Sequence, residues 1–152
     1  MKILICTDGS EHSKKTMDQA ALIASGCNVN EVAVLHVYDK KFDFSTLPRD
    51  EGLAPSRQDL EKFREMNDLM KEDSKKLLDE ALEYLADKDI KAEAIFKEGH
   101  PAQTIVETGC GGNFDMIFMG SRGIGGLKKL FLGSVSSAVV QEAEGCTIVI
   151  VR

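Results

Sequence analysis

The order of strand-like and helix-like segments constrains the fold of this chain more than any other feature. Short apolar runs typical of strands alternate with segments whose apolar residues recur at the three-and-four spacing of a helix. We predict five strands and four helices in strict alternation. Parallel neighbouring strands need a crossover helix between them, so this order predicts an α/β, doubly wound parallel sheet with helices on both faces.

The predicted strands are short and almost continuously apolar, as expected of strands that are covered on both faces. They span residues 2–7, 31–37, 91–97, 115–120 and 147–151. The first predicted helix starts at Ser10 or Ser13, either of which can cap it, and ends at Gly26; the others span 59–87, 101–109 and 134–144. The segment Tyr38–Arg57 has no clear period and holds two of the three prolines, so we predict an irregular insertion there.

Length and charge bound the function of the chain. The 152 residues fit one globular domain over 1–152, and the net charge of −6 argues against a nucleic-acid or anionic-membrane surface. No apolar run approaches the ~20 residues that span a bilayer, and the apolar start ends at Asp8, too early for a signal peptide. We therefore expect a cytoplasmic protein with no membrane and no nucleic-acid partner.

Two sets of sulfur-containing residues are predicted to be structural. Cysteines 6, 27, 110 and 146 lie far apart, with no C-x-x-C pair and no histidine at a metal-binding spacing. We expect buried or half-buried free thiols in a reducing compartment. Met66 and Met70 stand one helical turn apart in the second predicted helix, and we expect them to pack in the core.

In a doubly wound sheet, ligands bind beyond the carboxyl ends of the strands, where the strand order reverses. The residues that follow the predicted strands are therefore candidates for a binding site. They are Asp8, Val37 with Tyr38, Gly99 with His100, and the stretch from Gly120 onward. Asp8 has two interpretations, as a ligand contact or as a cap of the first helix or its turn.

The stretch from Gly120 to Gly133 is the segment richest in chemical information. It holds five of the thirteen glycines and three cations, and no acidic residue occurs between Asp115 and Glu142. Glycines let backbone N–H groups approach a ligand, and a helix that begins at Ser134 directs N–H donors and a positive dipole end at an anion. This composition predicts a phosphate site, with Arg122 either on phosphate or in solvent, and Lys128 and Lys129 in solvent.

Other phosphate-binding motifs are absent from the sequence. There is no G-x-x-x-x-G-K-[ST] segment, and no G-x-G-x-x-G follows the first predicted strand. A phospho-acceptor receiver domain needs acids clustered at strand ends, whereas the third strand ends in Lys97-Glu98-Gly99.

The spacing Gly120-x2-Gly123-x9-Gly133-Ser134 resembles the G-2x-G-9x-G-[ST] signature of the nucleotide-binding universal stress proteins. The segments 7–11, 35–37 and 99–102 are also similar to that family, so the resemblance covers nearly the whole chain outside the insertion. It implies a strand order of 3-2-1-4-5 and ATP bound at the junction of the first and fourth strands.

The resemblance also implies roles for individual residues, which we take over position by position. Asp8 is expected near the ribose or the metal, and the backbone of Cys6, Thr7 and Val37 is expected to face the adenine. Met119 and Gly120 are expected to close over the ribose. The phosphates, bridged by Mg²⁺ or Mn²⁺, are expected on Gly123, Gly133, Ser134, Val135 and Ser136. Cys6 departs from the family pattern, because many members carry Pro or Val there.

Three functions follow as hypotheses. The first is an ATP-binding regulatory or sensor module with at most slow hydrolysis, because only Asp8 could act as a base and its expected place is far from a γ-phosphate. The second is a nucleotide-independent interaction protein that acts as a homodimer, paired through the apolar edge strand Thr147–Val151. The third is a Mg²⁺-dependent ATP hydrolase.

Overall fold

The computed structural model describes residues 1–39, 56–123 and 132–152 of the chain. In these residues, five parallel strands form one sheet in the order β3-β2-β1-β4-β5, which confirms the predicted fold and strand order. The strands are β1 (Lys2–Cys6), β2 (Glu31–Tyr38), β3 (Glu93–Glu98), β4 (Met116–Gly120) and β5 (Thr147–Val151). The order reverses between β1 and β4, because the chain steps from β1 to β2 and β3 and then crosses back to β4.

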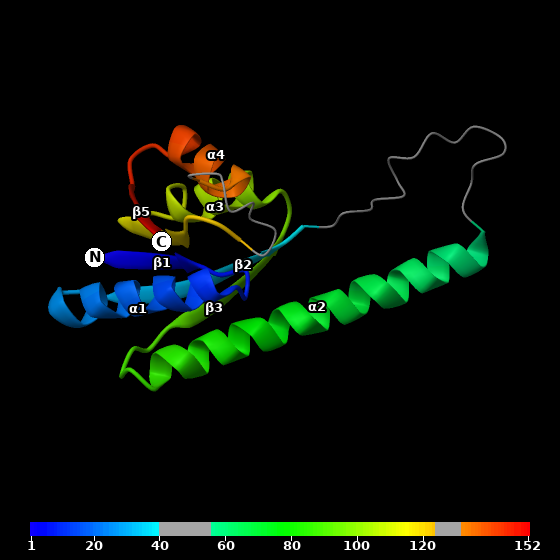
Figure 1. Cartoon of the computed structure of the whole chain (residues 1–152), viewed down its shortest axis with the longest axis horizontal. Helices are drawn as coiled ribbons and strands as arrows, with labels where there is room; N and C mark the ends of the chain where they lie inside the picture. The colour runs from blue at the N-terminus through cyan, green and yellow to red at the C-terminus, as the bar shows by residue number, and fades with distance from the viewer. Residues whose placement is uncertain (40–55, 124–131) are drawn as a thin grey trace.

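Four helices cover the two faces of the sheet (Figure 1). Helices α1 (Glu11–Gly26) and α2 (Arg57–Ala86) lie on one face, and α3 (Pro101–Gly109) and α4 (Ser134–Glu142) lie on the other. Side chains of successive strand residues point to opposite faces. Thus Ile3 and Ile5 of β1 pack against α1 and α2, whereas Leu4 packs against α3 and α4.

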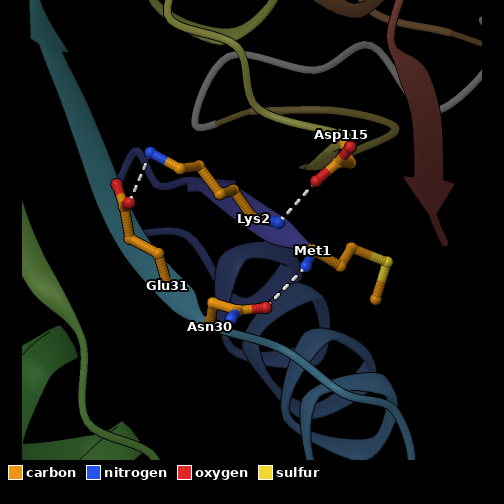
Figure 2. Close-up of polar contacts among 5 residues, drawn as sticks. All are labelled: Met1, Lys2, Asn30, Glu31 and Asp115. Carbon is orange, nitrogen blue, oxygen red and sulfur yellow. Dashed lines mark hydrogen bonds and ion pairs between the residues drawn. The ribbon is translucent and has the colours of Figure 1, made fainter.

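Polar contacts hold the amino ends of the central strands together (Figure 2). The Lys2 backbone N–H donates to the Asp115 carboxylate at 2.6 Å, and the Lys2 ammonium pairs with Glu31 at 2.6 Å. The amino nitrogen of Met1 donates to the Asn30 side chain at 2.8 Å. These contacts join β1 to the segments that precede β2 and β4 at the end of the sheet opposite the predicted ligand site.

Helix α2 is longer than the sheet that it covers. Its 30 residues extend over about 45 Å, whereas strands of 5 to 8 residues extend over roughly 17 to 26 Å. Its buried residues are Ser74, Leu78, Ala81 and Leu85, and its amino-terminal part extends past the sheet (Figure 1). The prediction for Met66 and Met70 was wrong: they are 43% and 42% exposed.

The boundaries of the predicted insertion are also corrected. Tyr38 is the last residue of β2, and its hydroxyl donates to the Asn67 side chain of α2 at 2.9 Å. Arg57 is the first residue of α2, which begins after a capping box formed by Ser56 and Asp59. Residues 40–55 of the predicted insertion lie outside the described residues.

The prediction of four free cysteines was wrong for one pair. Cys110, just after α3, forms a disulfide with Cys146, just before β5, although 36 positions separate them in the sequence. Cys6 is a free buried thiol as expected, whereas Cys27 is free and exposed. Across the described residues, no helix is both long and apolar enough to span a bilayer.

Candidate functional site

A cavity of about 460 Å³ opens where the carboxyl ends of β1 and β4 meet, at the reversal of strand order. Its volume is within the range of small-molecule sites. The twelve residues predicted from the sequence all line it: Cys6, Thr7, Asp8, Val37, Met119, Gly120, Arg122, Gly123, Gly133, Ser134, Val135 and Ser136. Their contact with a nucleotide stays a prediction.

Four further lining residues were not predicted: Ser13, Leu35, Pro101 and Ile105. Leu35 precedes Val37 by two positions, so its side chain points to the same face of β2. The two-residue period of a strand could therefore have predicted Leu35 from Val37. Pro101 and Ile105 lie in the first turns of α3, directly after the candidate residues Gly99 and His100. The sequence predicts Ser13 only as a cap of the first helix.

One end of the cavity is apolar. The side chains of Cys6, Leu35 and Met119 come from three adjacent strands, and those of Pro101 and Ile105 come from α3. Burial raises the pKa of the Cys6 thiol to about 12, so this group is neutral near pH 7 and adds to the apolar wall. An apolar end of this kind suits a flat aromatic ring.

The backbone at the ends of β1 and β2 is only partly available to a ligand. The Thr7 N–H donates to Leu35 O at 2.9 Å, and the Thr7 carbonyl bonds the His36 ring Nδ1 at 2.9 Å. Backbone groups two positions apart on a strand point to the same side, so those of Val37 point past the end of β1 toward the cavity. We therefore expect the backbone of Val37, rather than that of Thr7, to form hydrogen bonds with the edge of a ligand ring.

Asp8 belongs both to the turn that begins α1 and to the cavity wall. Its Oδ1 accepts from the Ser10 N–H at 3.0 Å and from the Ser13 hydroxyl at 2.7 Å. Its Oδ2 faces Gly123, where an added Cβ would lie 2.4 Å from it. Ser10 is the N-cap of α1, and Asp8 bonds the cap and the first turn rather than capping the helix itself.

Hydrogen bonds join the two ends of the glycine-rich loop. The Gly133 N–H donates to Ser121 O at 2.8 Å, and the Ser136 hydroxyl lies 3.0 Å from Ser121 O and 3.1 Å from Gly133 O. The Ser136 hydroxyl proton is thus engaged in closing the loop, which leaves the Ser136 backbone N–H to serve a ligand. Residues 124–131, with Lys128 and Lys129, lie outside the described residues.

Helix α4 begins at the cavity with its first N–H groups uncapped by any side chain of the described residues. Its N-cap is Gly133, whereas α1 and α2 begin at serines whose hydroxyls accept from their own first turns. The N–H groups of Ser134, Val135 and Ser136 precede the first intrahelical bond, which the Ser137 N–H donates to Gly133 O at 2.9 Å. With the helix dipole, these N–H groups could hold an anion.

A metal site made by the protein alone is not found among the described residues, which contain no group of three or more His, Cys, Asp or Glu side chains at ligand distances. Asp8 is the one carboxylate among the described lining residues. One carboxylate suits a Mg²⁺ that takes most of its ligands from phosphate and water.

The sequence model of the universal stress protein family matches residues 1–152 of the chain. Universal stress protein YxiE of Bacillus subtilis is 34% identical over 151 residues, which are 99% of this chain and 98% of that protein. Universal stress protein MJ0577 of Methanocaldococcus jannaschii is 31% identical over 156 residues, with 99% of this chain and 94% of that protein covered.

Solved structures have the same architecture. That of MJ0577 superposes with a TM-score of 0.78 at 27% identity and covers 99% of this chain and 94% of its own. A universal stress protein from Archaeoglobus fulgidus, solved in complex with dAMP, has a TM-score of 0.62 at 18% identity and covers 100% of this chain and 98% of its own.

Proposed function

The chain belongs to the universal stress protein family, and from this premise we propose that it binds ATP and acts as a regulatory or sensor module with at most slow hydrolysis. The observation that carries the proposal is the uncapped N-terminus of α4, which lines the same cavity as Asp8 and a group of apolar side chains. An adenine nucleotide can use all three, with its phosphates, its ribose and its ring. The dAMP complex of a relative supports an adenine nucleotide as the ligand.

The proposed pose assigns each part of ATP to one surface. The adenine ring lies among Cys6, Leu35 and Ile105, and the backbone of Val37 contacts its edge. The ribose lies beside Asp8 and Gly120, which follow β1 and β4 and line the same cavity. The phosphates lie on the first N–H groups of α4, where the helix dipole favours negative charge.

A bound Mg²⁺ or Mn²⁺ would neutralise part of the phosphate charge. It would be held by phosphate oxygens, with Asp8 as the available carboxylate of the described residues. Rapid hydrolysis also needs a group that orients or deprotonates water at the γ-phosphate. Asp8 is the one carboxylate among the described lining residues, and its Oδ1 is already engaged by Ser10 and Ser13, so we expect slow turnover.

Titration calorimetry with ATP and Mg²⁺ tests the proposal. We expect Gly133→Asp to abolish measurable binding, because it adds a negative charge at the N-cap of α4, while circular dichroism shows an intact fold. Gly26→Asp is the matched control, since Gly26 ends α1 with open space around it and does not line the cavity. Unchanged ATP affinity in Gly133→Asp would refute the proposed site.

Two cheaper measurements separate the alternatives. Mass spectrometry of the purified protein for co-purified nucleotide distinguishes an ATP binder from a nucleotide-independent interaction protein. A true hydrolase would release phosphate well above background with Mg²⁺ and would lose that activity in Asp8→Asn.

We also propose that the chain forms a homodimer through β5, in either functional class. Among the described residues β5 pairs only with β4, so one backbone edge of Thr147–Val151 has no strand beside it. The Thr147 N–H donates to Asp115 O, so the N–H groups of Ile148 and Ile150 point outward along that edge. An unpaired apolar edge favours pairing with a second copy.

Proline substitutions on β5 test the dimer. Ile148→Pro removes an outward N–H and leaves the β4 ladder intact, so we expect monomers in light scattering with little loss of stability. Val149→Pro is the matched control and removes an inward N–H, so it should destabilise the fold itself. A dimer that persists in Ile148→Pro at micromolar concentration would refute pairing through this edge.

A further inference from the structure

We propose that Ser13 is a positioning residue that holds the Asp8 carboxylate in the orientation needed to accept hydrogen bonds from ribose hydroxyls. The inference rests on the proposed ATP binding and deepens it. By this inference, the protein prefers nucleotides with free ribose hydroxyls because Ser13 of α1 orients Asp8. Ser13 itself need not contact the sugar.

Ser13 and Asp8 bond each other twice. The Ser13 hydroxyl donates to Asp8 Oδ1 at 2.7 Å, and the Asp8 backbone N–H donates back to Ser13 Oγ at 3.1 Å. A serine hydroxyl has one donor and two acceptor sites, so it can make both bonds at once. Together they fix the Asp8 side chain relative to its own backbone.

Burial makes this pair of bonds selective for one arrangement. Ser13 is 4% exposed, so little solvent competes with the carboxylate for its hydroxyl. A hydrogen bond to a charged group is shorter and stronger than a neutral one, and the 2.7 Å distance fits that class. The Asp8 carboxylate therefore has one strongly favoured orientation.

The opposite side of the carboxylate is bounded by the loop after β4. Gly123 leaves room for Oδ2, because any Cβ at this position would lie 2.4 Å from that oxygen. The carboxylate thus lies between α1, which holds Oδ1, and Gly123, which faces Oδ2. Both neighbours line the same cavity.

An ionised carboxylate only accepts hydrogen bonds, and ribose hydroxyls are donors. A carboxylate that is already oriented binds them without first losing rotational freedom, which increases affinity. Without Ser13, Asp8 would keep its charge but would sample other orientations. Ligands without ribose hydroxyls would not be affected by that change.

The test compares ATP with 2′,3′-dideoxy-ATP by titration calorimetry, each with Mg²⁺. We expect the wild-type protein to prefer ATP, and Ser13→Ala to lose about tenfold in ATP affinity with unchanged affinity for the dideoxy ligand. Asp8→Asn should also lose the preference for ATP. In the double variant, Ser13→Ala should cause no further loss of ATP affinity beyond that of Asp8→Asn alone.

Two further variants separate positioning from stability. Ser10→Ala removes the N-cap hydroxyl of α1 and leaves the Ser13 hydroxyl on Asp8, so it should lower the melting temperature and keep the preference for ATP. Ser13→Cys fills the same space with a weaker donor, so it should fold normally and lose much of the preference.

The outcomes are distinct. If Ser13→Ala and Ser13→Cys both discriminate as the wild type does, the positioning role is refuted and ATP binding stands. If the wild-type protein binds neither nucleotide, the proposed function fails and the role of Ser13 toward ribose fails with it. Loss of the preference in both Ser13 variants and its retention in Ser10→Ala supports the proposal.

Discussion

Substitution of Gly123 by alanine should weaken nucleotide binding by crowding Asp8. The new Cβ would lie 2.4 Å from Asp8 Oδ2, whereas ordinary contacts begin at 3.4 Å. The carboxylate must therefore move by about 1 Å, because the near atom is the end of the Asp8 side chain and overpacking displaces side chains from their rotamers. The movement stretches the bonds of 2.7 Å from Ser13 and 3.0 Å from Ser10 that hold Oδ1.

The expected loss follows from those bonds. One hydrogen bond to a charged group contributes about 1.5 to 3 kcal/mol. If the ligand needs the carboxylate in its present place, that energy corresponds to about 10- to 150-fold in affinity. Titration calorimetry of adenosine and ATP measures the loss, and both ligands should be affected alike because both carry the ribose.

Gly133→Ala is the matched control in the same signature. A Cβ there meets Ser121 O at 3.5 Å and Ser136 Oγ at 3.7 Å, which are ordinary contacts, and the backbone φ of −72° suits alanine. We expect this variant to keep its adenosine affinity and to lose about 0.5 to 1 kcal/mol of stability, because alanine is a poorer N-cap than glycine. Wild-type adenosine affinity in Gly123→Ala would refute the steric reasoning.

Three further predictions concern stability and reactivity. Iodoacetamide at pH 8 should modify exposed Cys27 rapidly and buried Cys6 hardly at all, because only the thiolate reacts and the pKa of Cys6 is raised to about 12; peptide mass spectrometry reads the result. Reduction of the Cys110–Cys146 disulfide, which closes a 36-residue separation, should lower the free energy of unfolding by roughly 3 to 4 kcal/mol in urea titrations. Leu85→Ala should cost about 2 to 5 kcal/mol in the same assay, whereas Leu69→Ala on the exposed half of α2 should change it by less than about 0.5 kcal/mol.

The fold could be predicted because its signals are local. Strand and helix periods, and caps such as Ser10 at α1, are properties of a few adjacent residues, and they indicated all nine elements of the described chain. The candidate site followed from the same logic. Once strand ends are known, the topology gathers the residues after them at one edge of the sheet, as it does for Asp8 and Gly120.

The remaining features depend on distances that no local pattern contains. Met66 and Met70 have the spacing of core residues, but the side chains of α2 that meet the ends of β2 and β3 in this stretch are Asn67 and Lys71, and both methionines stay exposed. Cys110 and Cys146 pair because the end of α3 and the start of β5 lie close together in the fold. Their separation of 36 residues in the sequence gives no sign of this proximity.

The sequence by itself determined the α/β class, the order of its elements and the strand ends at which a ligand site was expected. The family resemblance supplied most of the twelve predicted residues that line the cavity, and the structure added Ser13, Leu35, Pro101 and Ile105. Strand order came from the family resemblance and was confirmed by the structure. Only the tertiary structure decided how individual polar groups are used, with Ser136 closing the loop and Ser13 bonding Asp8. The physical reason is that hydrogen bonds and packing depend on ångström-scale geometry, whereas sequence periodicity specifies only which face or end of an element a residue occupies.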